Sequence, residues 1–234
     1  MKFSVVIALV WTLWAPASVG FADWHKIEAE EFALPSPPPQ ETWDAEIASL
    51  LERQEMRDQD TCNEARSQRI PSYTSFFDRR RFLSKRQFNK VKPLIEEALH
   101  FGERVSTHFK DQHLRLRPYN YDPRVQPCIQ PPKANKSYPS SHAALGQLAA
   151  CLLAIVLPHR ADVILEQGQR VGELRLWAGV HFPSDVKAGQ DLANDICERL
   201  QEEDDFKAEL MQLQQELSAP PDVRTASDVR LEAH

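Results

Sequence analysis

A segment that is apolar on nearly every side runs from Ser141 to Leu157, and Pro158 follows it directly. Most of its positions hold Ala, Leu, Ile or Val. A helix with no polar face belongs inside a domain, because every side of it must be covered by other elements. We therefore expect a helix over about 141–157 at the centre of the fold.

Other segments repeat apolar residues at the spacing of an amphipathic helix. In 185–200, Val186, Leu192 and Ile196 share one face, and charged residues occupy the opposite one. Six prolines lie between Arg117 and Pro139, a density that excludes a helix and indicates a long ordered loop. The remaining predictions are helices from Thr42, over 83–110 with a break or kink at Pro93, over 161–180 and over 206–217, and an irregular polar stretch over 62–82. Together these elements predict an all-α fold, a single-domain helical bundle.

The N-terminus has the layout of a secretory signal peptide. Lys2 precedes an apolar stretch from Phe3 to Trp14, and small residues suit cleavage near Ala22. That stretch is shorter than the ~20 residues needed to cross a bilayer. We therefore expect a periplasmic or secreted protein. Its predicted parts are a signal peptide (1–22), a Pro-rich N-terminal arm (23–41), a helical domain (42–217) and a flexible tail (218–234).

Charge and composition narrow the classes of partner. The 234 residues include 28 Lys and Arg against 34 Asp and Glu, a net charge of −6. This balance argues against a nucleic-acid partner, which would need a basic surface. No later segment is apolar enough over a sufficient length to span a membrane, so no membrane partner is expected. The sequence leaves a homo-oligomer open.

Residues suited to phosphate chemistry concentrate in three short segments, each at a helix end or in the Pro-rich loop. Ser140 can cap the central helix, whose first free N–H groups and positive dipole end suit an anion. Asp185 follows His181 by four residues and can fix the tautomer of that imidazole. The three segments are Lys110 to Arg117-Pro118, then Pro139-Ser140-Ser141-His142, and Arg175 through His181 to Asp185. Three cations, two histidines and a helix N-terminus predict a phosphate-transfer site.

In this order and spacing, the segments resemble the signature of the type 2 phosphatidic acid phosphatase superfamily. Within it they are most similar to the secreted class A non-specific acid phosphatases of bacteria. The signature reads K-x6-R-P, P-S-G-H and S-R-x5-H-x3-D. Two positions depart from it, because Ser141 replaces the glycine and Leu174 replaces the serine before Arg175. Neither departure removes a charge or a nucleophile, so we expect activity to be kept.

The resemblance implies an acid phosphatase that hydrolyses phosphate monoesters through a phosphohistidine. His181, held by Asp185, would be the nucleophile, and His142 would first protonate the leaving oxygen and then activate water. The implied phosphate-binding residues are Lys110, Arg117, Ser140, Ser141 and Arg175. The implied partners are small phosphomonoesters and inorganic phosphate, with no metal, no cofactor and a mildly acidic optimum.

Two other functions fit parts of the same pattern. A vanadate-dependent haloperoxidase shares the anion pocket and the histidine pair in the superfamily, although such enzymes tend to be longer chains. The departures at Ser141 and Leu174 also leave room for a catalytically weak anion-binding helical protein. Phosphate release that survives EDTA and is blocked by vanadate selects the phosphatase.

Four cysteines would meet an oxidising compartment after export, where disulfides are allowed. They permit three pairings. If the helices that carry Cys151 and Cys197 start at one site, the two residues lie about 13 Å and about 18 Å along their axes. A bridge between them is compatible with this difference, and so are two buried thiols. The bridge would leave Cys62 to pair with Cys128 and tie the polar stretch to the Pro-rich loop.

Overall fold

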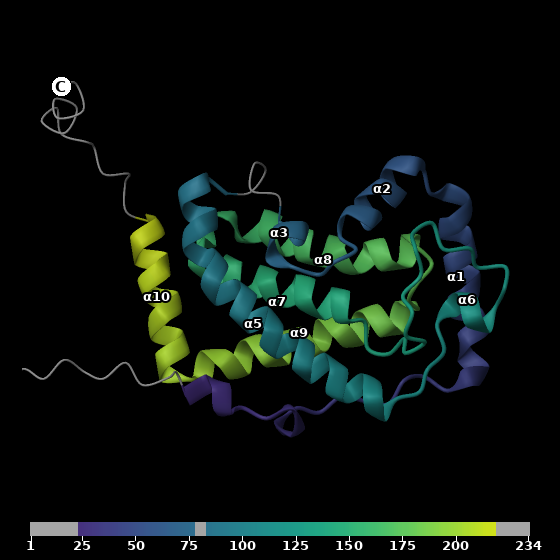
Figure 1. Ribbon diagram of the computed structural model, residues 1–234, viewed down its shortest axis with the longest axis horizontal. Coiled ribbons are helices and arrows are strands. Elements are labelled where there is room, and N and C mark those ends of the chain that lie inside the picture. The colour runs from purple at the N-terminus through teal and green to yellow at the C-terminus, as the bar shows by residue number, and fades with distance from the viewer. Residues whose placement is uncertain (1–22, 78–82, 219–234) are drawn as a thin grey trace, which may run out of the picture.

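The computed structural model describes residues 23–77 and 83–218 (Figure 1). The predicted signal peptide, and the predicted tail beyond Ser218, lie outside these residues. Every regular element in the described ranges is a helix, which confirms the all-α class. The α-helices are α1 (Trp43–Met56), α2 (Gln59–Ser67), α3 (Tyr73–Phe76), α5 (Lys85–Gln112), α6 (Pro118–Tyr121), α7 (Ser141–Val156), α8 (Ala161–Trp177), α9 (Pro183–Glu202) and α10 (Asp204–Ser218). Short 3-10 helices are η1 (Asp23–Lys26), η2 (Ala29–Glu31), η3 (Gln40–Thr42) and η4 (Pro158–Arg160).

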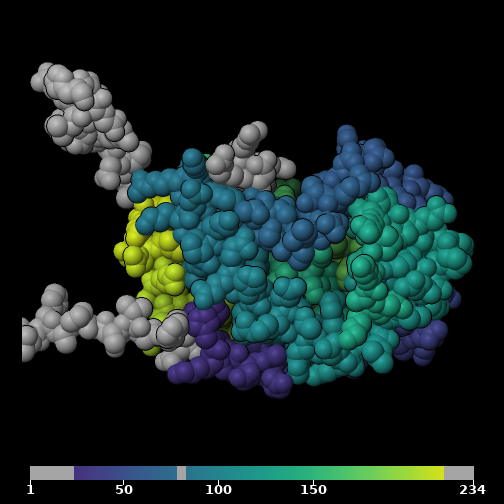
Figure 2. Space-filling view, in the orientation of Figure 1, coloured from purple at the N-terminus to yellow at the C-terminus, as the bar shows by residue number. Residues whose placement is uncertain are grey.

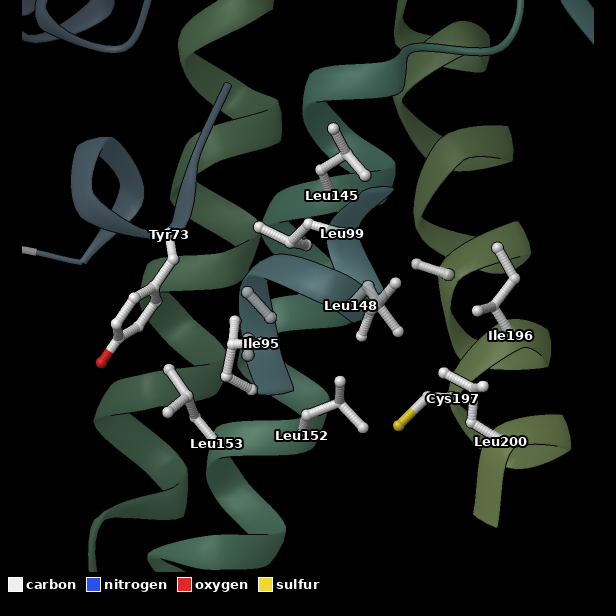
Figure 3. Packing of buried hydrophobic residues seen from close by; sticks show 14 of the residues in the cluster. Tyr73, Ile95, Leu99, Leu145, Leu148, Leu152, Leu153, Ile196, Cys197 and Leu200 are labelled. Carbon is white, nitrogen blue, oxygen red and sulfur yellow. The ribbon is translucent and has the colours of Figure 1, made fainter. Parts of the chain in front are cut away.

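Helix α7 packs against α5, α8, α9 and α10. Its Leu145, Leu148 and Leu152 are buried among apolar side chains of α5 and α9, such as Ile95 and Ile196 (Figure 3). The mostly small and branched apolar side chains of α7 cover every side of the helix, so neighbours can pack all round it. This arrangement fixes α7, and with it the residues at its N-terminal end.

Glycines let the helices approach closely where α7 and α9 begin. A Cβ at Gly189 of α9 would overlap the carbonyl oxygen of Ser140, the residue that caps α7. Helix α8 ends in a turn where Gly179 takes a φ of 71°, a left-handed conformation that glycine adopts without strain. The predicted helix over 161–180 therefore ends earlier, at Trp177.

Three sequence predictions need correction. The stretch 62–82 is not irregular throughout, because α2 extends into it and α3 lies within it. The side chain of Asp58 caps the N-terminus of α2, and that of Ser72 caps the N-terminus of α3. Helix α5 continues through Pro93 without ending there. The Pro-rich stretch does not exclude a helix, because it holds the four-residue α6, which begins at Pro118, a position where the missing N–H of proline costs no helical hydrogen bond.

The predicted N-terminal arm packs onto the helical body. Trp24 is 2% exposed, and its ring meets the edges of Phe101 and Phe206 at centroid distances of 6.2 Å and 5.3 Å. Further along, the carbonyl oxygen of Pro35 accepts a hydrogen bond from the Tyr138 hydroxyl at 2.7 Å. Residues 23–41 are therefore a strap along the bundle.

Two disulfides join the elements. Cys62 of α2 bonds to Cys128 of the Pro-rich loop, and Cys151 of α7 bonds to Cys197 of α9. Their Cα–Cα distances are 5.8 Å and 6.5 Å. Both predicted pairings are confirmed, and the alternative of buried thiols is wrong.

None of the helices in the described part of the chain has the length and apolarity needed to cross a membrane.

Candidate active site

Four helix ends meet at one end of the bundle. Helices α7 and α9 begin there and run in the same direction, while α5 and α8 end there (Figure 1). The backbone N–H of Ser140 donates to the carbonyl oxygen of Asp185 at 2.9 Å and joins the two helix starts. This junction brings the three predicted segments together, although up to 75 residues separate them along the chain.

A cavity of about 400 Å³ opens at this end of the bundle. Figure 2 shows the surface hollowed between α5, the segment around α2 and the Pro-rich loop. Six of the predicted site residues line the cavity: Lys110, Arg117, Ser141, His142, Arg175 and His181. A size of several hundred Å³ is typical of small-molecule sites.

His181 is held as a neutral imidazole with a defined tautomer. The Arg117 guanidinium can only donate, so its Nη1–H donates to His181 Nε2 at 2.9 Å and the ring proton must be on Nδ1. Nδ1 faces the Asp185 Oδ2 atom at 3.3 Å. Burial, together with the nearby Arg117 and Lys110 charges, holds the pKa of His181 well below its usual value. Nε2 therefore carries no proton, and its lone pair accepts the hydrogen bond from Arg117 at the edge of the cavity that His181 lines.

Asp185 is fully buried and receives hydrogen bonds on both oxygens. Oδ1 accepts from Arg115 Nη1 at 2.7 Å, and Oδ2 accepts from the Ser137 hydroxyl at 2.5 Å and from the Phe182 N–H at 2.8 Å. Burial raises the pKa of this carboxyl, and the Arg115 charge and the hydrogen bonds oppose that rise. We take Asp185 as ionised, because a buried carboxylate with a paired guanidinium is the stable form.

Arg115 extends this network to α1. It is 1% exposed, and its Nη2 bonds to Glu46 Oε2 at 2.5 Å. The other oxygen of Glu46 accepts the N–H of Ser184 at 2.8 Å, in the first turn of α9. The guanidinium also lies over the Phe182 ring, 4.0 Å from its centroid. A chain of charges therefore runs from Glu46 through Arg115 and Asp185 to His181.

His142 has a separate orienting contact. Its Nε2 lies 2.9 Å from the carbonyl oxygen of Gln68, which can only accept, so Nε2 carries a proton. This leaves Nδ1 as the nitrogen that can exchange a proton with a bound molecule. Burial and the Arg175 charge lower the pKa of His142 to about 3. The ring is therefore neutral near pH 7.

The predicted cations are held by backbone oxygens. Arg117 Nη1 also donates to Val180 O at 2.9 Å, and Arg175 Nη2 donates to Ala65 O at 2.9 Å. Lys110 Nζ donates to the carbonyl oxygen of Pro139, just before the start of α7. Burial and the Arg117 charge lower the pKa of Lys110 to about 7. Like charges crowded in this way are stabilised by a bound anion.

Ser140 does not face the cavity as predicted. It is fully buried, and its hydroxyl accepts the Ala143 N–H at 3.4 Å, so its role is to cap α7. Its neighbour Ser141 does line the cavity. Leu174, which replaces a serine of the signature, packs with Ala65 and Ile129 in a small apolar cluster beneath the cavity wall.

Four contributing residues were missed from the sequence: Glu46, Gln68, Arg115 and Ser137. For Arg115 the sequence contains a local pattern, because Arg115 lies between Leu114 and Leu116. The side chains of these two leucines are 81% and 40% exposed. In an extended segment, residues two apart share a side, so Arg115 points inward like Arg117. Glu46 and Gln68 had no such signal, because they act through contacts distant in sequence.

No group of three His, Cys, Asp or Glu side chains in the described ranges is arranged to hold a metal ion.

Comparison with known proteins agrees with this geometry. Residues 98–193, which include every predicted site residue, match a protein-family model. The matching family is the PAP2 superfamily. The resemblance predicted from the motifs is therefore confirmed.

Several curated relatives of this chain are acid phosphatases by name. A non-specific acid phosphatase of Providencia stuartii is 30% identical over 129 residues, 53% of this chain and 50% of that protein. One of Salmonella typhimurium is 30% identical over 134 residues, covering 56% and 52%. An acid phosphatase of Zymomonas mobilis is 37% identical over 81 residues, covering 35% and 31%. The chain thus spans about half the length of the first two relatives.

Proposed function

We propose that this protein is an exported, metal-independent acid phosphatase that hydrolyses small phosphate monoesters through a phosphohistidine at His181. The observation that carries the proposal is the state of His181. Its Nε2 carries no proton and accepts a hydrogen bond from Arg117, Asp185 faces its Nδ1 proton, and both His181 and Arg117 line the cavity. A phosphoryl group that binds Arg117 is thereby placed against the nucleophilic nitrogen.

In the first step, Arg117 donates to a phosphoryl oxygen in place of Nε2 of His181. The freed Nε2 lone pair attacks phosphorus, and the bond to the leaving oxygen breaks. As Nε2 becomes bonded, the ring gains positive charge, which Asp185 stabilises through Nδ1–H. The leaving oxygen takes a proton from Nδ1 of His142. For this, His142 must be protonated in the complex, and the charge of the bound phosphoryl group favours that form.

In the second step, His142 accepts a proton from water through Nδ1, and the resulting hydroxide attacks phosphorus. The N–P bond breaks, and inorganic phosphate leaves. Throughout, Gln68 O holds the Nε2 proton of His142 and keeps Nδ1 directed to the reaction. One ring therefore performs both proton transfers, as acid and then as base.

The charges around the cavity stabilise the transferring group. Lys110, Arg117 and Arg175 approach from three different elements, so they can contact the equatorial oxygens of the phosphoryl group together. In a partly buried site, such preorganised cations lower the barrier by stabilising charge where it accumulates. These cations supply the role that a metal ion has in other phosphatases, and this is our reason for proposing a metal-independent reaction.

A trapping experiment tests the covalent step. Protein mixed with p-nitrophenyl phosphate and quenched in alkali, where a phosphohistidine survives, should yield a peptide phosphorylated at His181. His142→Ala should accumulate this adduct, because it lacks the base for the second step. His159→Ala, which changes an exposed histidine of η4, is the matched control and should behave as wild type. Phosphate release without any adduct, or an adduct at another residue, would overturn the mechanism.

The broader activity has its own test. Phosphate release should persist in EDTA and be blocked by vanadate, because a vanadate ion can occupy the same anion site. Bromide oxidation in the presence of vanadate and peroxide, without phosphate release, would select the haloperoxidase instead. Export is tested by the N-terminal sequence of the mature protein, which should begin at Asp23.

A further inference from the structure

The cavity continues outward from the catalytic side chains. Its outer part is formed by Arg69 and Pro71, which follow α2, by loop residues 129–133, and by Glu103 of α5. The prolines and Ile129 in this lining offer an apolar surface, and the charged side chains stand beside it. With about 400 Å³ in total, a leaving group of the size of an aromatic ring fits beside the phosphoryl group.

Two cations of this outer part have no side-chain partner within the described residues. The segments 59–71 and 128–136 together hold four cations. Arg66 donates to Cys128 O at 3.2 Å and Lys136 pairs with Asp111, so both serve the structure. Arg69 and Lys133 are exposed, form no ion pair or side-chain hydrogen bond with the residues that the structure describes, and line the cavity. In a chain with a net charge of −6, two such cations at one opening favour an anionic ligand.

The two segments are fixed relative to each other. The Cys62–Cys128 disulfide joins them, with a Cα–Cα distance of 5.8 Å. Arg69 lies seven residues after the first cysteine and Lys133 five after the second. Beneath them, Ala65 and Ile129 pack in one apolar cluster. The two cations therefore face the cavity from walls that are already held together, which lowers the entropy cost of binding one anion between them.

From this arrangement we propose that the preferred substrates are phosphate monoesters whose leaving group carries a second anionic group, bound by Arg69 and Lys133. The inference rests on the proposed function and narrows its substrate class. The phosphoryl group binds among the catalytic cations, the body of the leaving group lies on the apolar lining, and its carboxylate or second phosphate meets the outer pair.

Glu103 allows a variant for which the proposal predicts the opposite change in substrate preference. It lines the same cavity from α5, is exposed, and forms no ion pair with either cation in the described part of the chain. Its charge repels a second anion, so it opposes Arg69 and Lys133. Removing a cation should weaken the preference for a second anion, and removing Glu103 should strengthen it.

The experiment compares 4-carboxyphenyl phosphate with 4-carbamoylphenyl phosphate, which have similar shapes and differ by one charge. The ratio of their kcat/KM values is measured for wild type, Arg69→Gln, Lys133→Gln, the double variant and Glu103→Gln. Lys92→Gln is the control, because Lys92 is an exposed cation of α5 about 27 Å along the helix from Lys110. Each single cation loss should lower the ratio about two- to fivefold, as for an exposed ion pair. The double variant should lower it further, Glu103→Gln should raise it, and Lys92→Gln should leave it unchanged.

The two proposals fail in different ways. If both esters are hydrolysed but Arg69→Gln and Lys133→Gln change the ratio no more than Lys92→Gln does, the second anion site is wrong and the phosphatase stands. If neither ester is hydrolysed by wild type, the proposed function is wrong and the substrate class falls with it.

Discussion

At the scale of single residues, Arg115 is the side chain on which the site depends most without facing the substrate. It forms ion pairs with both Asp185 and Glu46 and stacks on Phe182. We expect Arg115→Met to lower the free energy of unfolding by roughly 3–5 kcal/mol, because a buried carboxylate is left unpaired. Urea unfolding measures this loss. A change of under about 1 kcal/mol would show that Asp185 finds another partner.

Lys110 should give the site a pH-dependent affinity for anions. Burial and the Arg117 charge lower the pKa of Lys110 to about 7, and a bound dianion raises it. Above about pH 7, binding must therefore be accompanied by uptake of one proton, and the dissociation constant should rise about tenfold per pH unit. Calorimetry with sulfate, which does not titrate in this range, measures the slope. Lys110→Met should abolish it, and an equal slope in that variant would exclude Lys110 as its source.

His142 should matter most for leaving groups that need a proton. We expect His142→Ala to reduce kcat/KM for butyl phosphate by about 10²–10⁴-fold, the usual range for a general acid. p-Nitrophenolate leaves without protonation, so p-nitrophenyl phosphate should lose less in kcat/KM. Steady-state kinetics on the two esters decides this. Equal losses would contradict the role of His142 as the general acid.

At the scale of elements, the two disulfides should differ in their effect on catalysis, although they contribute similarly to the stability of the protein. Their loops of 66 and 46 residues each predict a contribution of about 4 kcal/mol through the unfolded chain. Only Cys62–Cys128 holds the elements that contact His142 and Arg175, through Gln68 O and Ala65 O. Replacing Cys62 and Cys128 with serine should therefore lower kcat at temperatures where the protein stays folded. The matched Cys151 and Cys197 double variant should lose stability alone, and equal effects on kcat would contradict this distinction.

The sequence predicts some elements better than others for physical reasons. Long segments with a clear apolar period, such as α7 and α9, are visible because burial imposes the period. Helix α2 has nine mostly polar residues and α3 has four, so neither is long enough to show a clear apolar period in the sequence. Motif spacing identified six of the residues that line the cavity. The residues that orient them, above all Glu46 and Gln68, act across the fold and leave no local pattern.

At the scale of the whole molecule, the first residues of the N-terminal strap pack against α10, while Pro35 further along bonds to Tyr138 beside the site. Trp24 packs beside α10, opposite the loops around the cavity (Figure 1). Trp24→Ala should lower the free energy of unfolding by about 3–5 kcal/mol, the usual cost of truncating a buried aromatic. It should leave kcat unchanged below the unfolding transition. Thermal unfolding and activity assays test both points, and a lower kcat in folded protein would show coupling between the two ends.

The shared direction of α7 and α9 has a consequence for the product. Both helices direct the positive ends of their dipoles to the cavity, and this field does not distinguish the phosphoryl group of an ester from the free phosphate that hydrolysis releases. Under the proposed function, phosphate in the surroundings therefore competes with every new substrate. Turnover falls where phosphate is plentiful and recovers where it is scarce, so the supply of phosphate outside the protein sets its output without a separate regulatory site.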